Sequence, residues 1–254
     1  MRALSRNKSR SVDEENPYWV SFSDLMSALL VVFILAAVAL IIELTQKQDQ
    51  FSQDIQKLKN AEQARRDILH EIRDELSKQN VTVLIADNDT VLRIPESTLS
   101  FDSDKDEIPD DPEVIQAVQL IGEVLHKAIN QPFHAEETNG LKRFEYLDTV
   151  FIEGHTDSLR SYRSKGNWGL STFRAISLWE FWNESLDVDP KMGELKNGYG
   201  NVLFSVSGYA ATRRVNEIES TPEERRSNRR IDIRFTVKRP ELADFEAVSA
   251  RAKQ

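Results

Sequence analysis

The most pronounced pattern in the chain is an almost uninterrupted apolar run between Tyr18 and Ile42. Its clearly polar side chains are Ser21, Ser23, Asp24 and Ser27. Because about 20 apolar residues cross the hydrocarbon core of a bilayer as a helix, we predict a transmembrane helix at 18–43. A cleaved signal peptide is the alternative, but its apolar region is usually shorter, and no small-residue cleavage site leads into a mature sequence.

Basic residues lie mainly before this run. Four of them precede it, namely Arg2, Arg6, Lys8 and Arg10. After it, Lys47 is the nearest basic residue. Since the cytoplasmic flank of a membrane helix carries the excess of Lys and Arg, the 1–17 tail is expected in the cytoplasm. The chain would then cross the inner membrane once and place the remaining residues in the periplasm.

A polar stretch that favours a helix follows at 44–80. It lacks Gly and Pro and carries apolar side chains at three- and four-residue spacing, which are Phe51, Ile55, Leu58, Leu69, Ile72 and Leu76. This spacing predicts a helix, and a parallel pair of short coiled coils that makes the chain a homodimer. Because Glu62 and Arg65 interrupt the apolar seam, a solvated single helix is the alternative.

From residue 81 onward, short alternating strands and amphipathic helices replace this pattern. Strands are expected at 81–85, 91–94, 146–154, 202–210 and 230–237. Helices are expected from Pro112 to Ile129 and from about Asn167, which suits an N-cap. This order predicts an α+β domain at 81–238, with a mixed sheet and helices on one side. A tail at 239–254 follows it.

Composition excludes several classes of function. The net charge of −9 and pI near 5.1 argue against nucleic-acid binding, since such proteins usually show a basic face. There is no cysteine for a disulfide or a thiolate metal site. The acidic loop from Asp102 to Pro112 lacks the glycine and closing glutamate of an EF-hand. We therefore expect no metal and no cofactor.

An enzymatic role would have to involve three neighbouring residues, His155, Asp157 and Ser158. A hydrolytic triad needs the nucleophile and base within hydrogen-bond reach and an oxyanion site, which adjacent loop residues do not guarantee. The sequence also lacks the HExxH pattern of zinc hydrolases. We expect a protein that is not an enzyme.

Asp24 needs a chemical explanation, because it lies about 9 Å into the helix when counted from Tyr18 at 1.5 Å per residue. It is either a hydrated interfacial acid, favoured by the dipole of the helix N-terminus, or a carboxylate enclosed by partner helices. An enclosed carboxylate can bind and release a proton near neutral pH. Ser21, Ser23 and Ser27 would line a polar path or serve as small packing residues.

The stretch PYWVSFSDLMSALLVVFIL resembles the membrane segment of MotB-type stator subunits. Within that family, its Pro-aromatic-Trp opening and SDLMSALLVVF resemble the ZorB-type subunits of Zorya anti-phage defence systems. The resemblance implies that Asp24 is the ion carrier of a channel completed by a multi-pass MotA-like or ZorA-like subunit. A proton is the expected ion, and sodium stays open. A flagellar motility stator and a non-conducting tether between membrane and cell wall are the alternatives.

The segments VLRIPESTLSF, VFIEGHTDS, NWGLSTFRA, VSGYA and RRSNRRIDIRF resemble an OmpA-like peptidoglycan-binding domain. The resemblance implies that Asp157 and Arg174 hold the zwitterionic end of diaminopimelate in the peptide stem. Alternatively, Asp157 caps the following turn and pairs internally with Arg174. The family's NxxLSxxRA pattern is matched by Asn167, Leu170, Ser171, Arg174 and Ala175, and the resemblance implies that Asn167 and Leu170 also belong to the peptidoglycan-binding site. Asn228 and Arg230 would border the groove, or only hold the last strand. The insert at 187–201 departs from the shortest family members.

Overall fold

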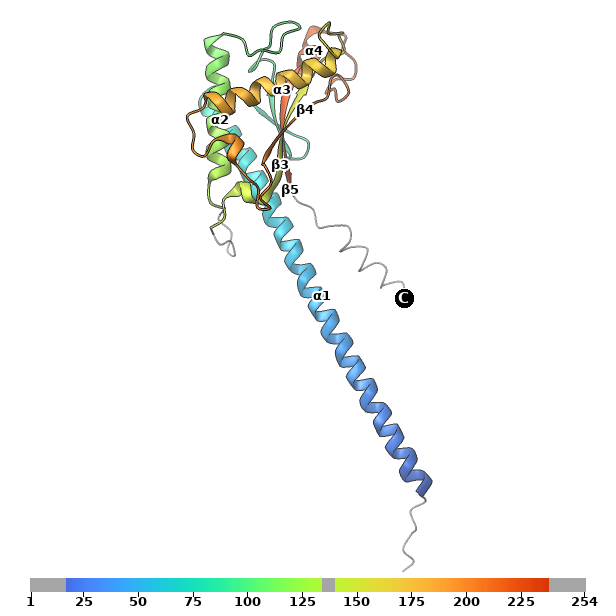
Figure 1. Cartoon of the computed structure of the whole chain (residues 1–254). Coiled ribbons are helices and arrows are strands. Elements are labelled where there is room, and N and C mark those ends of the chain that lie inside the picture. Colours follow the sequence, from blue (N-terminus) through green and yellow to red (C-terminus); the bar gives the residue numbers. More distant parts are fainter. Residues whose placement is uncertain (1–16, 134–139, 238–254) are drawn as a thin grey trace, which may run out of the picture. The chain divides into compact units, whose positions relative to one another are not determined.

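The computed structural model describes residues 17–133 and 140–237 (Figure 1). The predicted tail at 239–254, and all but the last residue of the tail at 1–17, lie outside the described residues. The chain divides into two compact units, Met1–Asp54 and Ile55–Gln254.

The first unit contains the N-terminal part of α1, Pro17–Lys78, which is a single helix of 62 residues. Near its N-terminus the helix has an 18-residue window with a mean hydropathy of 3.1, so it is long and apolar enough to cross a membrane. The large apolar side chains of this part are exposed. This pattern suits a segment that faces lipid or partner helices. The sequence predicts two adjoining helical segments at 18–43 and 44–80, whereas the structure has one continuous helix.

The second unit is built on a five-stranded sheet with the order β1-β2-β5-β3-β4. Its strands are β1 Leu84–Ala86, β2 Val91–Pro95, β3 Leu147–His155, β4 Phe204–Gly208 and β5 Arg230–Val237. The strands β3 and β4 are parallel, and all other neighbours are antiparallel. The sheet is therefore mixed, as the order of elements predicts.

Short polar motifs set the ends of several elements. Asp87, Asn88 and Asp89 form the turn between β1 and β2 with φ values of 52°, 54° and 56°, a conformation that Asp and Asn tolerate better than most residues. The helix α2, Pro112–Asn130, starts at Asp111, whose side chain accepts a hydrogen bond from the Glu113 N–H. The remaining helical elements are η1 Arg143–Tyr146, α3 Gly166–Ser185, η2 Met192–Glu194 and α4 Pro222–Asn228.

One face of the sheet supplies the core. Its inward-facing residues alternate along the strands, as expected for a half-buried sheet. They are Leu92, Ile94, Val150, Ile152, Ile231, Ile233 and Phe235. These side chains belong to one apolar cluster with buried residues of α1, α2 and α3. The helices thus cover the apolar face, which confirms the predicted fold class.

The C-terminal part of α1 belongs to this core. Ile68, Leu69, Ile72 and Leu76 are completely buried against the domain. Three of these residues were assigned to the coiled-coil seam, but their apolar surface is already covered within a single chain. The folded unit therefore begins before residue 81, because the sheet needs this part of α1 to close its core. The spacing alone could not distinguish a helix packed on a sheet from a helix packed on its copy.

Candidate functional site

The predicted ion-carrying residues lie together on α1. Asp24 is exposed in the isolated chain, as are Ser21, Ser23 and Ser27. The Ser27 hydroxyl donates a hydrogen bond of 2.7 Å to the Ser23 carbonyl oxygen one turn earlier. This internal bond satisfies the Ser27 hydroxyl in an apolar setting, while its oxygen keeps acceptor capacity.

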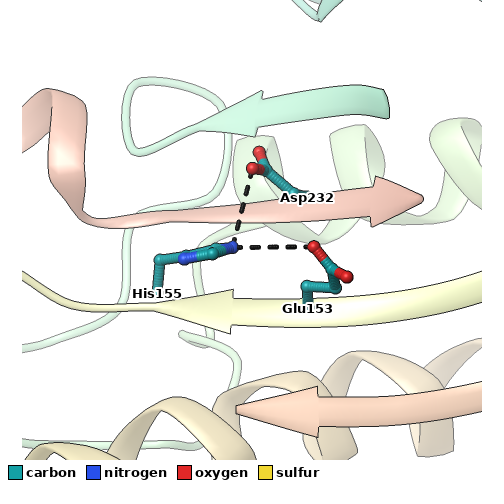
Figure 2. Close-up of side chains that lie close together, drawn as sticks. All are labelled: Glu153, His155 and Asp232. Atoms are coloured by element: carbon teal, nitrogen blue, oxygen red, sulfur yellow. Dashed lines mark ion pairs between the residues drawn. The ribbon is translucent and has the colours of Figure 1, made fainter. Parts of the chain in front are cut away.

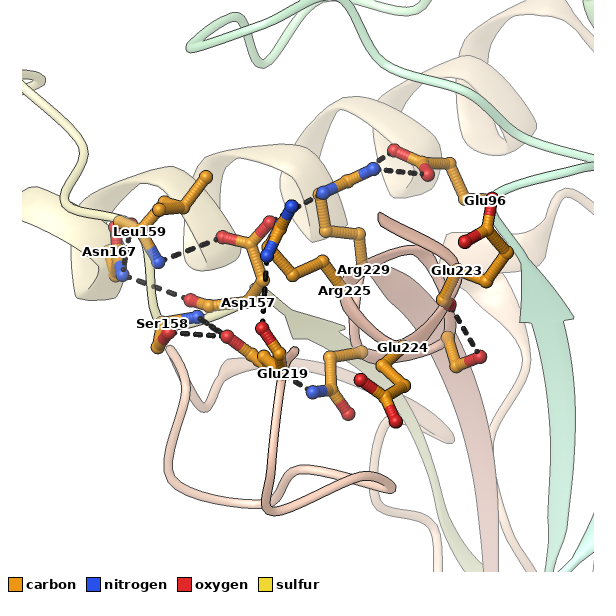
Figure 3. Close-up of polar contacts among 12 residues, drawn as sticks. Glu96, Asp157, Ser158, Leu159, Asn167, Glu219, Glu223, Glu224, Arg225 and Arg229 are labelled. Atoms are coloured by element: carbon orange, nitrogen blue, oxygen red, sulfur yellow. Dashed lines mark hydrogen bonds and ion pairs between the residues drawn. The ribbon is translucent and has the colours of Figure 1, made fainter. Parts of the chain in front are cut away.

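Asp157 lies in the loop that leaves the end of β3, and only 5% of it is exposed. Its Oδ1 accepts a hydrogen bond of 3.1 Å from the Leu159 N–H. Its Oδ2 accepts a bond of 2.5 Å from Nη1 of Arg229 (Figure 3). The carboxylate therefore caps its own turn and also faces a guanidinium group.

Asn167 fixes the loop that carries Asp157, rather than capping α3. The helix starts at Gly166 after Lys165, whose φ of 66° is left-handed, so Asn167 is already inside its first turn. Its side-chain nitrogen donates to the carbonyl oxygens of Asp157 and Leu159 at 3.2 and 2.9 Å. Its Oδ1 accepts from the Ser161 N–H at 2.8 Å. The predicted N-cap role is thus wrong, because the side chain points to the loop.

Arg174 is 6% exposed and mainly holds the acidic loop. Its Nε donates to the Lys105 carbonyl oxygen at 2.8 Å and its Nη2 to that of Asp102 at 3.0 Å. The guanidinium carbon lies 4.9 Å from the centre of the Phe101 ring. Burial lowers the pKa of Arg174 to about 10, although the charge of Glu96 opposes this shift. Among the described contacts there is no ion pair between Arg174 and Asp157, so the internal pairing weighed from the sequence is not formed.

Leu170 is 6% exposed and is a core residue of α3 rather than a surface contact.

The helix α3 packs very close to the strand β3 at Gly154. A Cβ at Gly154 of β3 would lie 1.9 Å from the Ser171 carbonyl oxygen. Glycine is thus required where β3 passes the helix.

The carboxylate of Glu219 closes the loop on the other side of Asp157. It accepts hydrogen bonds from the Ser158 N–H at 3.0 Å and from the Ser158 hydroxyl. It also accepts a bond of 2.6 Å from the Asn228 side chain. Burial alone would raise the pKa of Glu219, but these hydrogen bonds lower it below its ordinary value. The hydrogen bonds therefore keep Glu219 ionised and tie two loops together.

Asn228 itself is completely buried and organises the chain before α4. Its Oδ1 accepts from the backbone N–H groups of Val215 and Asn216 at 2.7 and 3.0 Å. Its side-chain nitrogen also donates to the Asn216 carbonyl oxygen at 2.8 Å. Asn228 therefore acts on the site only through the loops that it holds.

Arg229 directly follows α4 and Arg230 is the first residue of β5, and their side chains bind different groups. Arg229 faces Asp157 and forms two bonds to Glu96, with Nε–Oε1 at 2.5 Å and Nη2–Oε2 at 2.7 Å (Figure 3). Arg230 is 7% exposed and binds Asp232 on the polar face. The sequence motif points to Arg230 and not to Arg229, although both belong to the same Asn-Arg-Arg element. Neighbouring side chains near the start of a strand extend in different directions, which is the signal that could have distinguished them.

The polar face of the sheet carries a buried cluster of Glu153, His155 and Asp232 (Figure 2). The His155 Nε2 lies 3.6 Å from Oδ2 of Asp232 and 3.9 Å from Oε2 of Glu153. Burial and the charge of Arg230 lower the pKa of His155 to about 3. The imidazole is therefore neutral at physiological pH.

This cluster is, among the described residues, the group whose donor atoms are spaced for a metal ion. Its carboxylates, however, already bind guanidinium groups. Arg93 and Arg230 bind Asp232 at 2.9 and 3.0 Å, and Arg234 binds Glu153 at 2.9 Å. Three cations beside two anions oppose a further positive charge. The geometry is that of a buried ion network across three strands.

The residues weighed for a hydrolytic triad separate in the structure. His155 faces the polar cluster and stacks on Tyr209, with ring centres 5.4 Å apart. Asp157 binds Arg229, and the Ser158 hydroxyl binds Glu219. No charge relay joins these residues in the described part of the chain.

The acidic loop after β2 is likewise occupied by protein donors. The Ser161 hydroxyl donates to Oδ1 of Asp104 at 2.5 Å. Asp106 pairs with Arg163, and Lys105 binds Asp102 at 2.8 Å. Hydroxyl and cationic groups thus take the place that a metal ion would need.

Comparison with known proteins supports the resemblance to ZorB. No family model matches the chain. Over 166 residues the chain is 27% identical to the Zorya protein ZorB of Escherichia coli O139:H28 (strain E24377A / ETEC). The match covers 63% of this chain but spans only 59% of the length of that relative.

The chain is similar to several solved structures. A MotB-like protein from Desulfovibrio vulgaris is similar with a TM-score of 0.51 at 16% identity, covering 71% of this chain and 99% of that one. The periplasmic domain of Helicobacter pylori MotB gives a TM-score of 0.47 at 17% identity, covering 67% of this chain and 92% of that one. The first likeness confirms a MotB-like fold for the second unit.

Proposed function

We propose that this chain is a subunit of an ion-driven complex in the bacterial inner membrane and that it anchors the complex to peptidoglycan, as part of a Zorya-type anti-phage defence system. One observation carries the proposal. A single chain combines Asp24 in a membrane-length apolar helix with a charged site around Asp157 in a MotB-like domain. A stator requires both features, because ion flow produces force only against a fixed point.

The charged site suits a ligand centre that bears an ammonium and a carboxylate group. Asp157 supplies an anion, and Arg174 and Arg229 supply cations close to it. Charge-assisted bonds between guanidinium and carboxylate are among the strongest polar contacts in proteins. Diaminopimelate in the peptide stem of peptidoglycan carries both groups on one carbon, and it is the ligand that we propose.

At the other end of the chain, we propose that Asp24 carries protons in a channel completed by a MotA-like or ZorA-like subunit. An aspartate in hydrocarbon is costly unless protein or water surrounds it. One helix cannot enclose a carboxylate, so partner helices are required. Ser21, Ser23 and Ser27 would line the path of the ion.

We further propose a homodimer with cytoplasmic N-termini and periplasmic folded domains. Leu44 and Ile55 are 66% and 50% exposed on α1, so this stretch keeps apolar surface for a second copy. The pairing would stop where the helix enters the core. Cysteine pairs introduced between residues 44 and 58 should cross-link at matching positions, whereas failure of every pair would contradict the dimer.

Two substitutions test the two ends of the proposal. Asp24→Asn should abolish defence and proton flux at unchanged abundance and partner assembly. Asp157→Asn should reduce sedimentation with purified sacculi. If Asp24→Asn leaves both activities intact, the chain is a non-conducting tether. If wild-type protein does not sediment with sacculi, the anchoring role is wrong.

The remaining alternatives need separate measurements. A flagellar stator would restore swimming in a strain that lacks its own MotB-type subunit, whereas the proposed defence subunit would protect against phage and leave swimming unchanged. Activity that disappears when the sodium gradient is removed at constant membrane potential would contradict proton coupling.

A further inference from the structure

Asp157 is already engaged by Arg229 in the structure. The distance between Oδ2 of Asp157 and Nη1 of Arg229 is 2.5 Å. Arg229 is also held by Glu96 through two bonds of 2.5 and 2.7 Å. Both carboxylates raise the pKa of Arg229 above its ordinary value, with the Glu96 hydrogen bonds the larger cause. A ligand ammonium that binds Asp157 must therefore compete with a resident guanidinium group.

The guanidinium group of Arg229 is also more accessible to solvent than that of Arg174. Its side chain is 27% exposed, compared with 7% for the side chain of Asp157. Arg174 is 6% exposed, and its Nε and Nη2 are committed to backbone carbonyl oxygens. Arg229 uses three of its five N–H groups in the described bonds to Glu96 and Asp157. A carboxylate that arrives from solvent would meet Arg229 first.

We propose that Arg229 binds the carboxylate of the ligand's zwitterionic centre while the ligand's ammonium group pairs with Asp157, and that Glu96 holds the guanidinium in position. This inference rests on the proposed peptidoglycan function. It assigns a specificity role to Arg229, a residue that the sequence motif does not single out.

The exchange leaves no charge unpaired. The ion pair between Asp157 and Arg229 opens, the ammonium replaces the guanidinium at Asp157, and the ligand carboxylate replaces Asp157 at Arg229. Glu96 retains Arg229 throughout because its bonds approach from another edge of the guanidinium (Figure 3). A stem that carries lysine in place of diaminopimelate has the ammonium without the carboxylate. It would open the same ion pair and leave Arg229 with Glu96 as its one remaining carboxylate partner in these contacts, and losing an ion-pair partner in a partly buried site is costly.

The decisive measurement is a preference ratio. Two soluble muropeptides, identical except for diaminopimelate or lysine at the third stem position, are titrated into the detergent-solubilised full chain. Wild-type protein should bind the diaminopimelate form at least about 10-fold more tightly, as expected for one charge-assisted contact. Arg229→Gln should reduce this preference to less than about 3-fold, mainly by weakening the diaminopimelate form.

Arg226→Gln provides a matched control. Arg226 is exposed, lies on α4 and has the same charge, so its removal should leave the preference unchanged. Arg229→Lys keeps a positive charge at this position, so it still tests the role of Arg229 if the Gln variant does not fold. Because lysine cannot make the forked contact with Glu96, it should retain a preference between those of the wild type and Arg229→Gln.

The outcomes separate this inference from the proposed function. If wild-type protein binds neither muropeptide nor sacculi, the peptidoglycan function fails. If wild-type protein prefers diaminopimelate and both Arg229 variants keep the full preference, the specificity role of Arg229 is wrong while the function stands. An equal loss for both muropeptides would also overturn the inference, because it would mean that Arg229 only positions Asp157.

Discussion

The indole Nε1 of Trp182 donates a hydrogen bond of 2.8 Å to the Val118 carbonyl oxygen, and both residues are completely buried. This contact joins α3 to α2. It is possible because residue 122, one turn after Val118, is glycine. A Cβ at Gly122 would lie 2.6 Å from Cδ1 of Trp182 and 2.6 Å from Cδ1 of Leu186. The close approach of the two helices therefore depends on this missing methyl group.

Gly122→Ala should destabilise the domain by about 1–3 kcal/mol, as overpacking of a filled core usually does. The helix propensity of alanine would offset at most about 1 kcal/mol of this cost. Denaturant unfolding followed by tryptophan fluorescence measures the difference. Gln119→Ala, an exposed change on the same helix, should stay within about 0.5 kcal/mol of the wild type. Equal stabilities of all three proteins would contradict the packing described here.

Ile72→Ala tests whether the end of α1 belongs to the folded domain. Ile72 is completely buried in the core, whereas Ile218 is 74% exposed. The buried substitution should cost about 2–5 kcal/mol because it leaves a cavity. The same substitution at Ile218 should cost less than about 0.5 kcal/mol. If Ile72→Ala instead has an effect that vanishes at low protein concentration, the residue stabilises a dimer rather than the core.

Asn167→Ala should loosen the loop that presents Asp157. The variant loses three hydrogen bonds between the Asn167 side chain and the backbone, two donated by Asn167 and one accepted from Ser161, each worth about 1 kcal/mol. Retention on sacculi should fall at least about 5-fold, with a smaller loss of thermal stability. Ser177→Ala on the same helix, outside the loop, should leave retention unchanged. Full retention by Asn167→Ala would show that the loop does not depend on this side chain.

The lowered pKa of His155 predicts that the protein loses stability in mild acid. Its pKa in the folded state is lowered to about 3, first by burial and then by the charge of Arg230, while Asp232 opposes the shift. In the unfolded chain a histidine has a pKa near about 6.5, so the unfolded state binds the extra proton between these values. The contribution of the neutral His155 imidazole to the free energy of unfolding is fully present above the pKa of the unfolded state. It is lost as the pH falls below that value.

Between pH 7 and 5 the free energy of unfolding should decrease by about 2 kcal/mol from this group alone. His155→Gln should make the profile less steep in that window, where His126, whose pKa is also lowered by burial, keeps a contribution. Resonances of the His155 ring should not titrate above pH 5. A ring that titrates near pH 6.5 would show that the imidazole is not buried as described.

Several features of the fold could be predicted from local patterns. The alternation of Ile231 and Ile233 with polar residues predicted β5, and the helical spacing of Val118, Ile121 and Leu125 predicted α2. These predictions succeeded because each element buries one face, and burial of one face imposes a period on the sequence. The role of Ile72 was predicted incorrectly because the period identifies a buried face without identifying what covers it.

The sequence by itself determined the membrane-length apolar segment and the order of strands and helices, because these depend on side-chain chemistry and on short-range periodicity. The motifs that resemble an OmpA-like domain pointed to Asp157 and Arg174, but not to Arg229 or Glu96. Only the tertiary structure decided that α1 completes the core, that Arg229 rather than Arg230 faces Asp157, and that Arg174 holds the acidic loop. These relationships join residues far apart in the chain. Their distances depend on how the helices pack on the sheet and on which face each strand residue points to, and no local pattern contains that information.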